Sequence, residues 1–176
     1  MKTTYPELPF PDTYWLTSEI LAGELPIASI SDFTDLKLES LLNAGIRSFI
    51  NLTQEDNFNY DELLQQVANR INIEAHYFSF PIKDMDIPSI AQMQTILDTI
   101  DASLKDGKPV YYHCYAGLGR TGMVSACWLK RHNNLEGKEI LRQLQEIRDK
   151  QHHKPTCESP ETEKQREFVL QWQFGL

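Results

Sequence analysis

The chain reads His-Cys-Tyr-Ala-Gly-Leu-Gly-Arg-Thr-Gly from His113 to Gly122, and this stretch predicts a strand, a tight loop and the start of a helix. The apolar run 109–112 just before it is typical of a buried strand. A helical pattern follows from about Thr121. At such a junction several backbone N–H groups point to one place, where they and the helix dipole favour an anion. We expect the same field to hold Cys114 as a thiolate.

The rest of the chain alternates strand and helix patterns, which predicts an α/β fold with the cysteine at the carboxyl end of a strand. In the predicted helices, Phe33, Leu36, Leu41 and Leu42 face inward, as does a stripe that begins at Ile90. Short strands and turns are predicted over 14–29. Further strands are predicted at 46–52, 75–80 and 109–113, and helices at 32–43, 60–70, 89–104, 121–131, 137–149 and 160–173.

Length and composition indicate one globular domain. The chain has 176 residues, of which 41% are hydrophobic and 24% charged. We expect a single domain over 1–176, with an extended N-terminal arm at 1–14 and a core from about 20 to 173. The net charge of −8, from 17 basic and 25 acidic residues, disfavours nucleic acid and anionic membranes as partners.

The expected location is the cytoplasm. No apolar run approaches the ~20 residues of a membrane helix, and the N-terminus lacks the apolar core of a signal peptide. The three cysteines, Cys114, Cys127 and Cys157, are an odd number without metal-ligand spacing.

We expect Cys127 and its neighbour Trp128 to lie in the core, and His152 and His153 to face solvent. Cys157 has a further possible role, a protective disulfide with Cys114 under oxidation.

The stretch from His113 resembles the Cys-x5-Arg signature of the cysteine-dependent protein-tyrosine and dual-specificity phosphatases. Six specified positions match within ten residues: His113, Cys114, Gly117, Arg120, Thr121 and Gly122. The alternative is a core cysteine beside a glycine turn, which has no need of His, Cys and Arg at this spacing. The short length and the Pro-Ile-x-Asp stretch are similar to the kinase-associated phosphatases and small bacterial relatives. The resemblance implies a single domain with a central mixed sheet flanked by helices, and no metal or organic cofactor.

The resemblance also implies roles for the residues of this stretch. Cys114 is the nucleophile that forms a phosphocysteine, and Arg120 binds two phosphate oxygens. Thr121 hydrogen-bonds the Cys114 sulfur, or caps the helix. His113 organises the loop and favours the thiolate, or is a hydrogen-bonded core histidine. The phosphate cradle consists of the backbone N–H groups of Tyr115, Ala116, Gly117, Leu118, Gly119 and Arg120.

A general acid is expected in the segment 80–88, which resembles the mobile acid loop of the family. There an aspartate precedes a proline by four positions, as Asp84 precedes Pro88. Asp86 is the rival, and either could instead be a solvated aspartate or a helix cap.

The C-terminal segment 159–168 resembles the Gln-Thr-x-x-Gln-x-x-Phe segment of tyrosine-specific phosphatases. Thr162, Gln165 and Phe168 match, whereas Glu161 stands where the family has its first glutamine. Gln165 is therefore a candidate to position the hydrolytic water, with Asp84 acting as base as the alternative. The same residues also make a good helix start.

We therefore expect a phosphomonoester hydrolase that acts on a phosphorylated protein or peptide at phosphotyrosine; the depth of the pocket decides whether phosphoserine and phosphothreonine are substrates too. One alternative is an inositol phosphate or phosphoinositide substrate, although the loop carries no lysine. The other is a non-catalytic module that binds phosphate.

Overall fold

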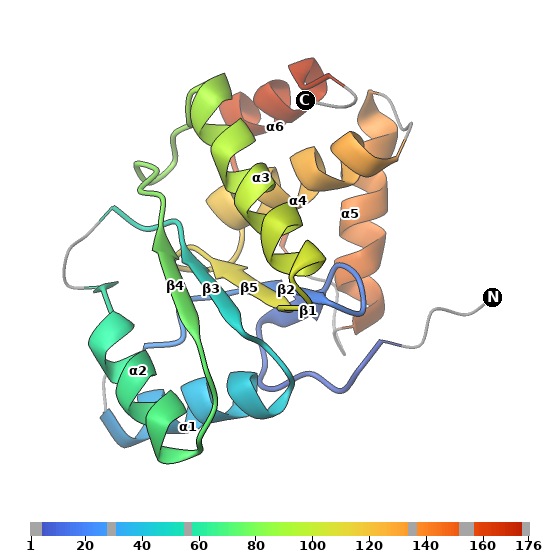
Figure 1. Ribbon diagram of the computed structural model, residues 1–176. Helices are drawn as coiled ribbons and strands as arrows, with labels where there is room; N and C mark the ends of the chain where they lie inside the picture. The colour runs from blue at the N-terminus through green and yellow to red at the C-terminus, as the bar shows by residue number, and fades with distance from the viewer. Residues whose placement is uncertain (1–4, 28–30, 55–57, 134–136, 152–156, 174–176) are drawn as a thin grey trace.

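A computed structural model describes residues 5–27, 31–54, 58–133, 137–151 and 157–173, and it shows a five-stranded sheet between two layers of helices (Figure 1). The strand order is β1-β2-β5-β3-β4; β1 is antiparallel to β2 and the other pairs are parallel. This is the mixed sheet that was expected. The strands are β1 (Thr13–Trp15), β2 (Ile20–Gly23), β3 (Ser48–Asn51), β4 (His76–Ser79) and β5 (Val110–His113).

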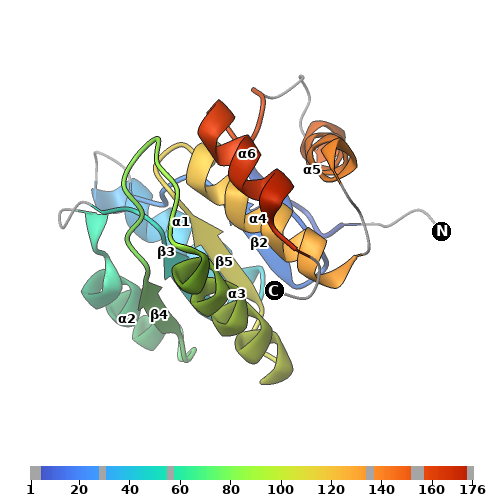
Figure 2. The ribbon, with the colours of Figure 1, turned by 90° about the horizontal axis from the view of Figure 1, so that it is seen from above.

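Helices cover both faces of the sheet, as Figures 1 and 2 show from two directions. One face carries α1 (Ser31–Asn43) and α2 (Asp61–Arg70). The other carries α3 (Ile90–Lys105), α4 (Gly119–His132), α5 (Lys138–Gln151) and α6 (Glu163–Gln171). Two apolar cores result, and the strand period of two divides β5 between them. Tyr111 packs in the core under α1 and α2, and Val110 and Tyr112 pack in the other.

The central position of β5 explains its sequence and places the cysteine. It pairs with β2 along one edge and with β3 along the other, and helices cover both faces of the sheet, so all four of its residues are buried. A parallel strand covered on both faces reads as a continuous apolar run. Cys114 follows directly, at the carboxyl end of the middle strand of the sheet.

Some inward faces were predicted wrongly. Phe33 and Leu36 are 56% and 59% exposed, and Ile90 is 58% exposed. Leu41 and Leu42 are buried as predicted, and Leu38 completes the buried stripe of α1. This stripe packs in the core shared with α2.

Two helix starts also differ from the prediction. α4 begins at Gly119, two residues early, so Arg120 lies in its first turn. α6 begins at Glu163, three residues late, after a Thr162 cap. Among the described residues, no helix is both long and apolar enough to cross a membrane.

Candidate active site

The loop after β5, residues 114–118, is called the cysteine loop and is held against the end of β2. The Tyr115 carbonyl accepts a hydrogen bond from Leu25 N at 2.9 Å. Gly117 has a φ of 71°, and a Cβ there would lie 2.6 Å from the Gly23 carbonyl carbon. Only glycine fits both the left-handed backbone and this close approach. Gly117, one of the six signature positions, is therefore required by the geometry of the loop.

The first turn of α4 closes the cysteine loop. Leu118 is its N-cap, and its side chain makes no cap hydrogen bond. The N–H groups of a first helical turn have no intrahelical acceptors, so they remain available to an anion. Thr121 Oγ1 accepts a hydrogen bond from Cys114 N at 2.8 Å, and Cys114 itself is 3% exposed. Thr121 thus ties the Cys114 backbone to α4; its contact with the sulfur remains a prediction.

The Arg120 side chain is only 2% exposed, and its three guanidinium nitrogens have different surroundings. Nη1 donates to the Ile82 carbonyl at 3.0 Å, and Nη2 lies 2.9 Å from Asp84 Oδ1. Nε is buried and has no hydrogen-bond partner. Nε and Nη2 form the side-on edge of a guanidinium, which suits two oxygens of one phosphate. One donor of that edge is therefore orphaned, and the other is held by a carboxylate.

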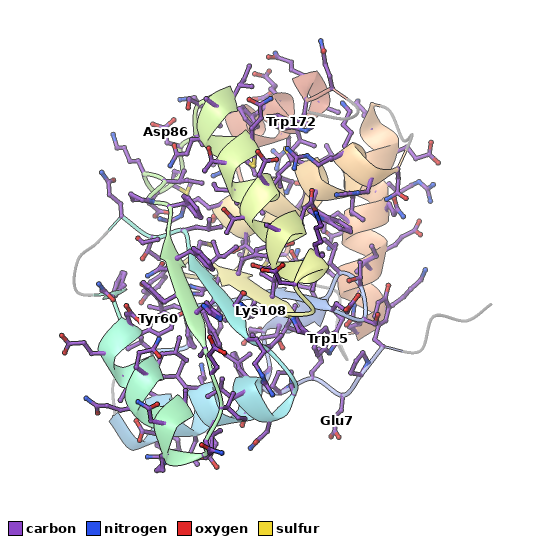
Figure 3. All side chains as sticks on the ribbon, viewed as in Figure 1. Glu7, Trp15, Tyr60, Asp86, Lys108 and Trp172 are labelled. Carbon is purple, nitrogen blue, oxygen red and sulfur yellow. The ribbon has the colours of Figure 1, made fainter. Side chains whose placement is uncertain are left out.

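The two aspartates of the 80–89 loop have different surroundings. Asp84 is 62% exposed in its side chain and reaches Arg120 at the cysteine loop. Asp86 instead pairs with Lys164 of α6 and accepts a hydrogen bond from Ile87 N at 2.9 Å. Lys164 first, and then the Ile87 N–H, lower the pKa of Asp86. Asp86 therefore stays ionised, which suits it poorly to donate a proton. Figure 3 labels Asp86 on the loop that joins β4 to α3.

His113 is fully buried, and its hydrogen bonds assign its tautomer. Nδ1 lies 3.0 Å from the Cys114 carbonyl, which can only accept, so Nδ1 carries the proton. Nε2 then accepts from the Tyr60 hydroxyl at 2.7 Å. Burial lowers the pKa of His113 to about 4. The ring is therefore neutral near pH 7 and contributes geometry, not charge, to the cysteine loop.

A pH-dependent stability follows from His113. Between pH 6.5 and about 4, the unfolded chain binds a proton that the native ring does not, so lowering the pH favours unfolding. We expect His113 to remove roughly 2–3 kcal/mol of stability between pH 7 and pH 4.5. Urea denaturation of wild type and His113→Gln at both pH values checks this. The gap in stability between the two proteins should narrow at low pH, and a constant gap would contradict the assignment.

The start of α6 lies against the cysteine loop. Gln165 is 1% exposed, and a Cβ on Gly119 would lie 2.8 Å from its Oε1. Its amide is engaged by protein groups: Oε1 accepts from Thr162 N at 3.1 Å and Nε2 donates to the Asp86 carbonyl at 3.2 Å. Gln165 therefore lies beside the site, as the resemblance implied, and it also completes the helix cap that was the alternative.

Two further residues support the cysteine loop and were not predicted. Ser159 Oγ donates to the Leu118 carbonyl at 2.7 Å and is almost fully buried. A Cβ on Gly122 would lie 2.0 Å from this oxygen, so the signature glycine makes room for Ser159. Tyr60, labelled in Figure 3, reaches His113 from the start of α2. Only Gly122, as a small residue within the signature, could have indicated such a neighbour.

The remaining described residues that the sequence singled out are either buried or exposed at the surface. Tyr115 is 60% exposed, and its ring lies 5.5 Å from that of Phe58. Cys127 is buried, and burial raises the pKa of its thiol well above the usual range, so it remains a thiol. Trp128 is also buried, as predicted, and Cys157 is an exposed free cysteine. His152 and His153 lie outside the described residues. Among the residues that the structure describes, no group of three or more His, Cys, Asp or Glu side chains could hold a metal ion.

Known proteins share this fold. The solved structure of Tk-PTP in the active form superposes with a TM-score of 0.71 at 24% identity, covering 92% of this chain and 95% of that one. PTPMT1 in complex with PI(5)P superposes with a TM-score of 0.70 at 17% identity, covering 92% and 94%. Identities at this level establish the fold alone.

Sequence comparison establishes the family. Protein tyrosine phosphatase domain-containing protein 1 of Mus musculus is 30% identical over 128 residues, which is 65% of this chain. The chain spans only 16% of that protein's length. Residues 27–134 match the family described as "Polymorphic toxin system, DSP-PTPase phosphatase", and this match takes in both the 80–89 loop and the whole cysteine signature. The chain therefore belongs to the dual-specificity and tyrosine phosphatase family.

Proposed function

We propose that the chain hydrolyses phosphomonoesters of proteins, with phosphotyrosine as the preferred residue, through a phosphocysteine on Cys114. The observation that carries the proposal is the buried Arg120 guanidinium, whose Nε has no protein partner. A buried, unpaired donor is costly unless a ligand satisfies it. A phosphate that takes Nε and Nη2 satisfies the orphaned donor and displaces Asp84 from the other.

In the first step, the Cys114 thiolate attacks phosphorus, the S–P bond forms and the ester P–O bond breaks. The cysteine-loop N–H groups and Arg120 hold the three equatorial oxygens. Once the phosphate has displaced it from Nη2, the Asp84 carboxylate takes up a proton from solvent beside the phosphate oxygens and gives that proton to the leaving oxygen. Asp86 is kept from this role by its ion pair with Lys164.

In the second step, water attacks phosphorus and the S–P bond breaks, which returns the thiolate and releases inorganic phosphate. Asp84, now a carboxylate, accepts the proton of that water. We assign this base to Asp84 because the Gln165 amide is engaged by Thr162 and Asp86. Gln165 then serves to hold the 80–89 loop and the cysteine loop together.

The aromatic pair beside the cysteine supports phosphotyrosine as the preferred residue. Tyr115 follows Cys114 directly, and Phe58 is fixed behind it because Asn51 Nδ2 donates to the Phe58 carbonyl at 2.9 Å. An exposed ring held in this way offers a face to an aryl ester. Lys164, which lies beside the 80–89 loop, is paired with Asp86, and this leaves it ill-suited to an additional phosphate of an inositol ligand.

Phosphotyrosyl and phosphothreonyl peptides of one sequence, together with a soluble phosphoinositide, test the substrate class. We expect the phosphotyrosyl peptide to have the highest kcat/KM. Tyr115→Ala should lower that value about three- to tenfold, mainly through KM, because an aromatic contact is lost. Tyr115→Phe should restore it, and Phe33→Ala, which removes an exposed ring on α1, should change nothing. Equal losses on both peptides would refute the aromatic contact, and a preferred phosphoinositide would refute the substrate class.

A further inference from the structure

The first turn of α6 joins the 80–89 loop to the start of α4, which closes the cysteine loop. Gln165 donates to the Asp86 carbonyl at 3.2 Å while its side chain packs against Gly119. The Thr162 cap fixes Gln165, because Thr162 Oγ1 accepts from Gln165 N at 3.1 Å. Figure 2 shows α6 lying alongside α4, whose first residues close the cysteine loop. A movement of α6 would therefore shift both the 80–89 loop and the start of α4.

Lys164, the neighbour of Gln165, makes the second connection to the 80–89 loop. Its Nζ pairs with Asp86 Oδ1, the oxygen that also accepts from Ile87 N. The Lys164 and Asp86 side chains are 58% and 34% exposed. Such an ion pair is accessible to solvent and is weakened by added salt.

Asp86 fixes the turn that carries Asp84. Asp86 N donates to the Lys83 carbonyl at 3.1 Å, which closes a tight turn around Asp84 and Met85. At the other end of the turn, Ile82 N donates to the Leu52 carbonyl at 3.0 Å and the Ile82 carbonyl accepts from Arg120. The turn is thus held at one end by the sheet and Arg120, and at the other by α6. Its exposed tip carries Asp84.

We propose that Lys164 and Asp86 are positioning residues, whose ion pair anchors the 80–89 loop to α6 and holds Asp84 where the leaving oxygen will be. The inference rests on the proposed function, in which Asp84 is the general acid. It predicts that the pair matters when the leaving group needs a proton and matters little when it does not. It also predicts that salt reduces acid catalysis in wild type by screening the pair.

The test compares kcat for a phosphotyrosyl peptide with kcat for p-nitrophenyl phosphate, whose leaving group is activated. Lys164→Met should lower kcat on the peptide about two- to fivefold, as expected for an exposed ion pair. It should leave p-nitrophenyl phosphate within about twofold, and Lys164→Arg should restore the peptide rate. Raising the salt should lower kcat on the peptide in wild type and not in Lys164→Met. Lys150→Met is the matched control, because Lys150 pairs with Glu146 on α5.

Asp86→Asn should reproduce Lys164→Met, and the double variant should be no worse than either single one, because both remove the same pair. Equal losses on the two substrates, or additive losses in the double variant, would overturn the proposal. Asp84→Asn separates this failure from failure of the proposed function. If Asp84→Asn loses the peptide rate and Lys164→Met does not, only the anchoring role fails. If Asp84→Asn keeps the peptide rate, Asp84 is not the acid and the anchoring role fails with it.

Discussion

Asp84→Asn is expected to lower kcat for a phosphotyrosyl peptide by about 10²–10⁴-fold, the usual contribution of a positioned general acid. Asparagine keeps the shape of the side chain and cannot donate the proton that the leaving oxygen needs. The loss should be much smaller for p-nitrophenyl phosphate, whose leaving group departs without help. Steady-state kinetics on both substrates at one pH check the difference.

Asp86→Asn is the matched control for this prediction. Asp86 lies two residues further along the same loop, and its carboxylate is paired with Lys164. Its loss on the peptide should stay within the two- to fivefold range expected for an exposed ion pair. If Asp86→Asn shows the large, leaving-group-dependent loss and Asp84→Asn does not, the roles of the two aspartates are reversed.

Arg120→Lys is expected to lower kcat by about 10²–10³-fold, comparable to removing an oxyanion donor. Arg120 has two separate tasks: Nη1 holds the Ile82 carbonyl, and Nε and Nη2 together form the edge offered to phosphate. A lysine ammonium keeps the charge but is a single point, so it cannot serve the 80–89 loop and two phosphate oxygens at once. The loss should appear on p-nitrophenyl phosphate as well, because the edge is needed for any leaving group.

Tungstate affinity and thermal melting accompany the Arg120→Lys measurement. The variant should bind tungstate more weakly and melt cooperatively, which separates loss of the site from loss of the fold. Arg70→Lys, on the exposed face of α2, is the control and should behave as wild type. A near-normal kcat in Arg120→Lys would remove the two-pronged role assigned to this residue.

The fold was predictable where a run of residues carries its own signal. Buried β5 shows as a continuous apolar stretch, and α3 shows as an apolar stripe after Ser89, whose side chain caps the helix by accepting from Gln92 N. The inward faces of α1 and the start of α3 were less predictable. Phe33, Leu36 and Ile90 are apolar residues at helical spacing, yet they lie exposed. Whether these residues are buried depends on where the neighbouring elements end. The spacing of apolar residues carries no information about that.

The candidate site also contains residues that the sequence predicts and residues that it does not. Cys114 lies at the start of the cysteine loop and Arg120 in the helical turn that directly follows it, so their spacing alone predicts that they act together. Ser159 and Lys164 reach the site through contacts that span 41 and 78 residues of sequence. Ser159 contributes a hydroxyl that binds a backbone carbonyl, and Lys164 contributes an ordinary surface ion pair. Neither contact produces a pattern of residue types that can be recognised in the sequence. The spacing to Pro88 already favoured Asp84 over Asp86, and the different partners of the two aspartates support that choice.

Catalysis by the Cys114 thiolate is tested most directly by p-nitrophenyl phosphate hydrolysis by the reduced protein in EDTA, wild type beside Cys114→Ser, with mass spectrometry of the rapidly quenched reaction. We expect activity to survive chelation and to vanish in Cys114→Ser, and we expect wild type to carry a phosphate adduct on the Cys114 peptide. A folded wild type with a free thiol and no activity from pH 5 to 8 would contradict thiolate catalysis and favour a phosphate-binding module. Activity that persists in Cys114→Ser would contradict it as well.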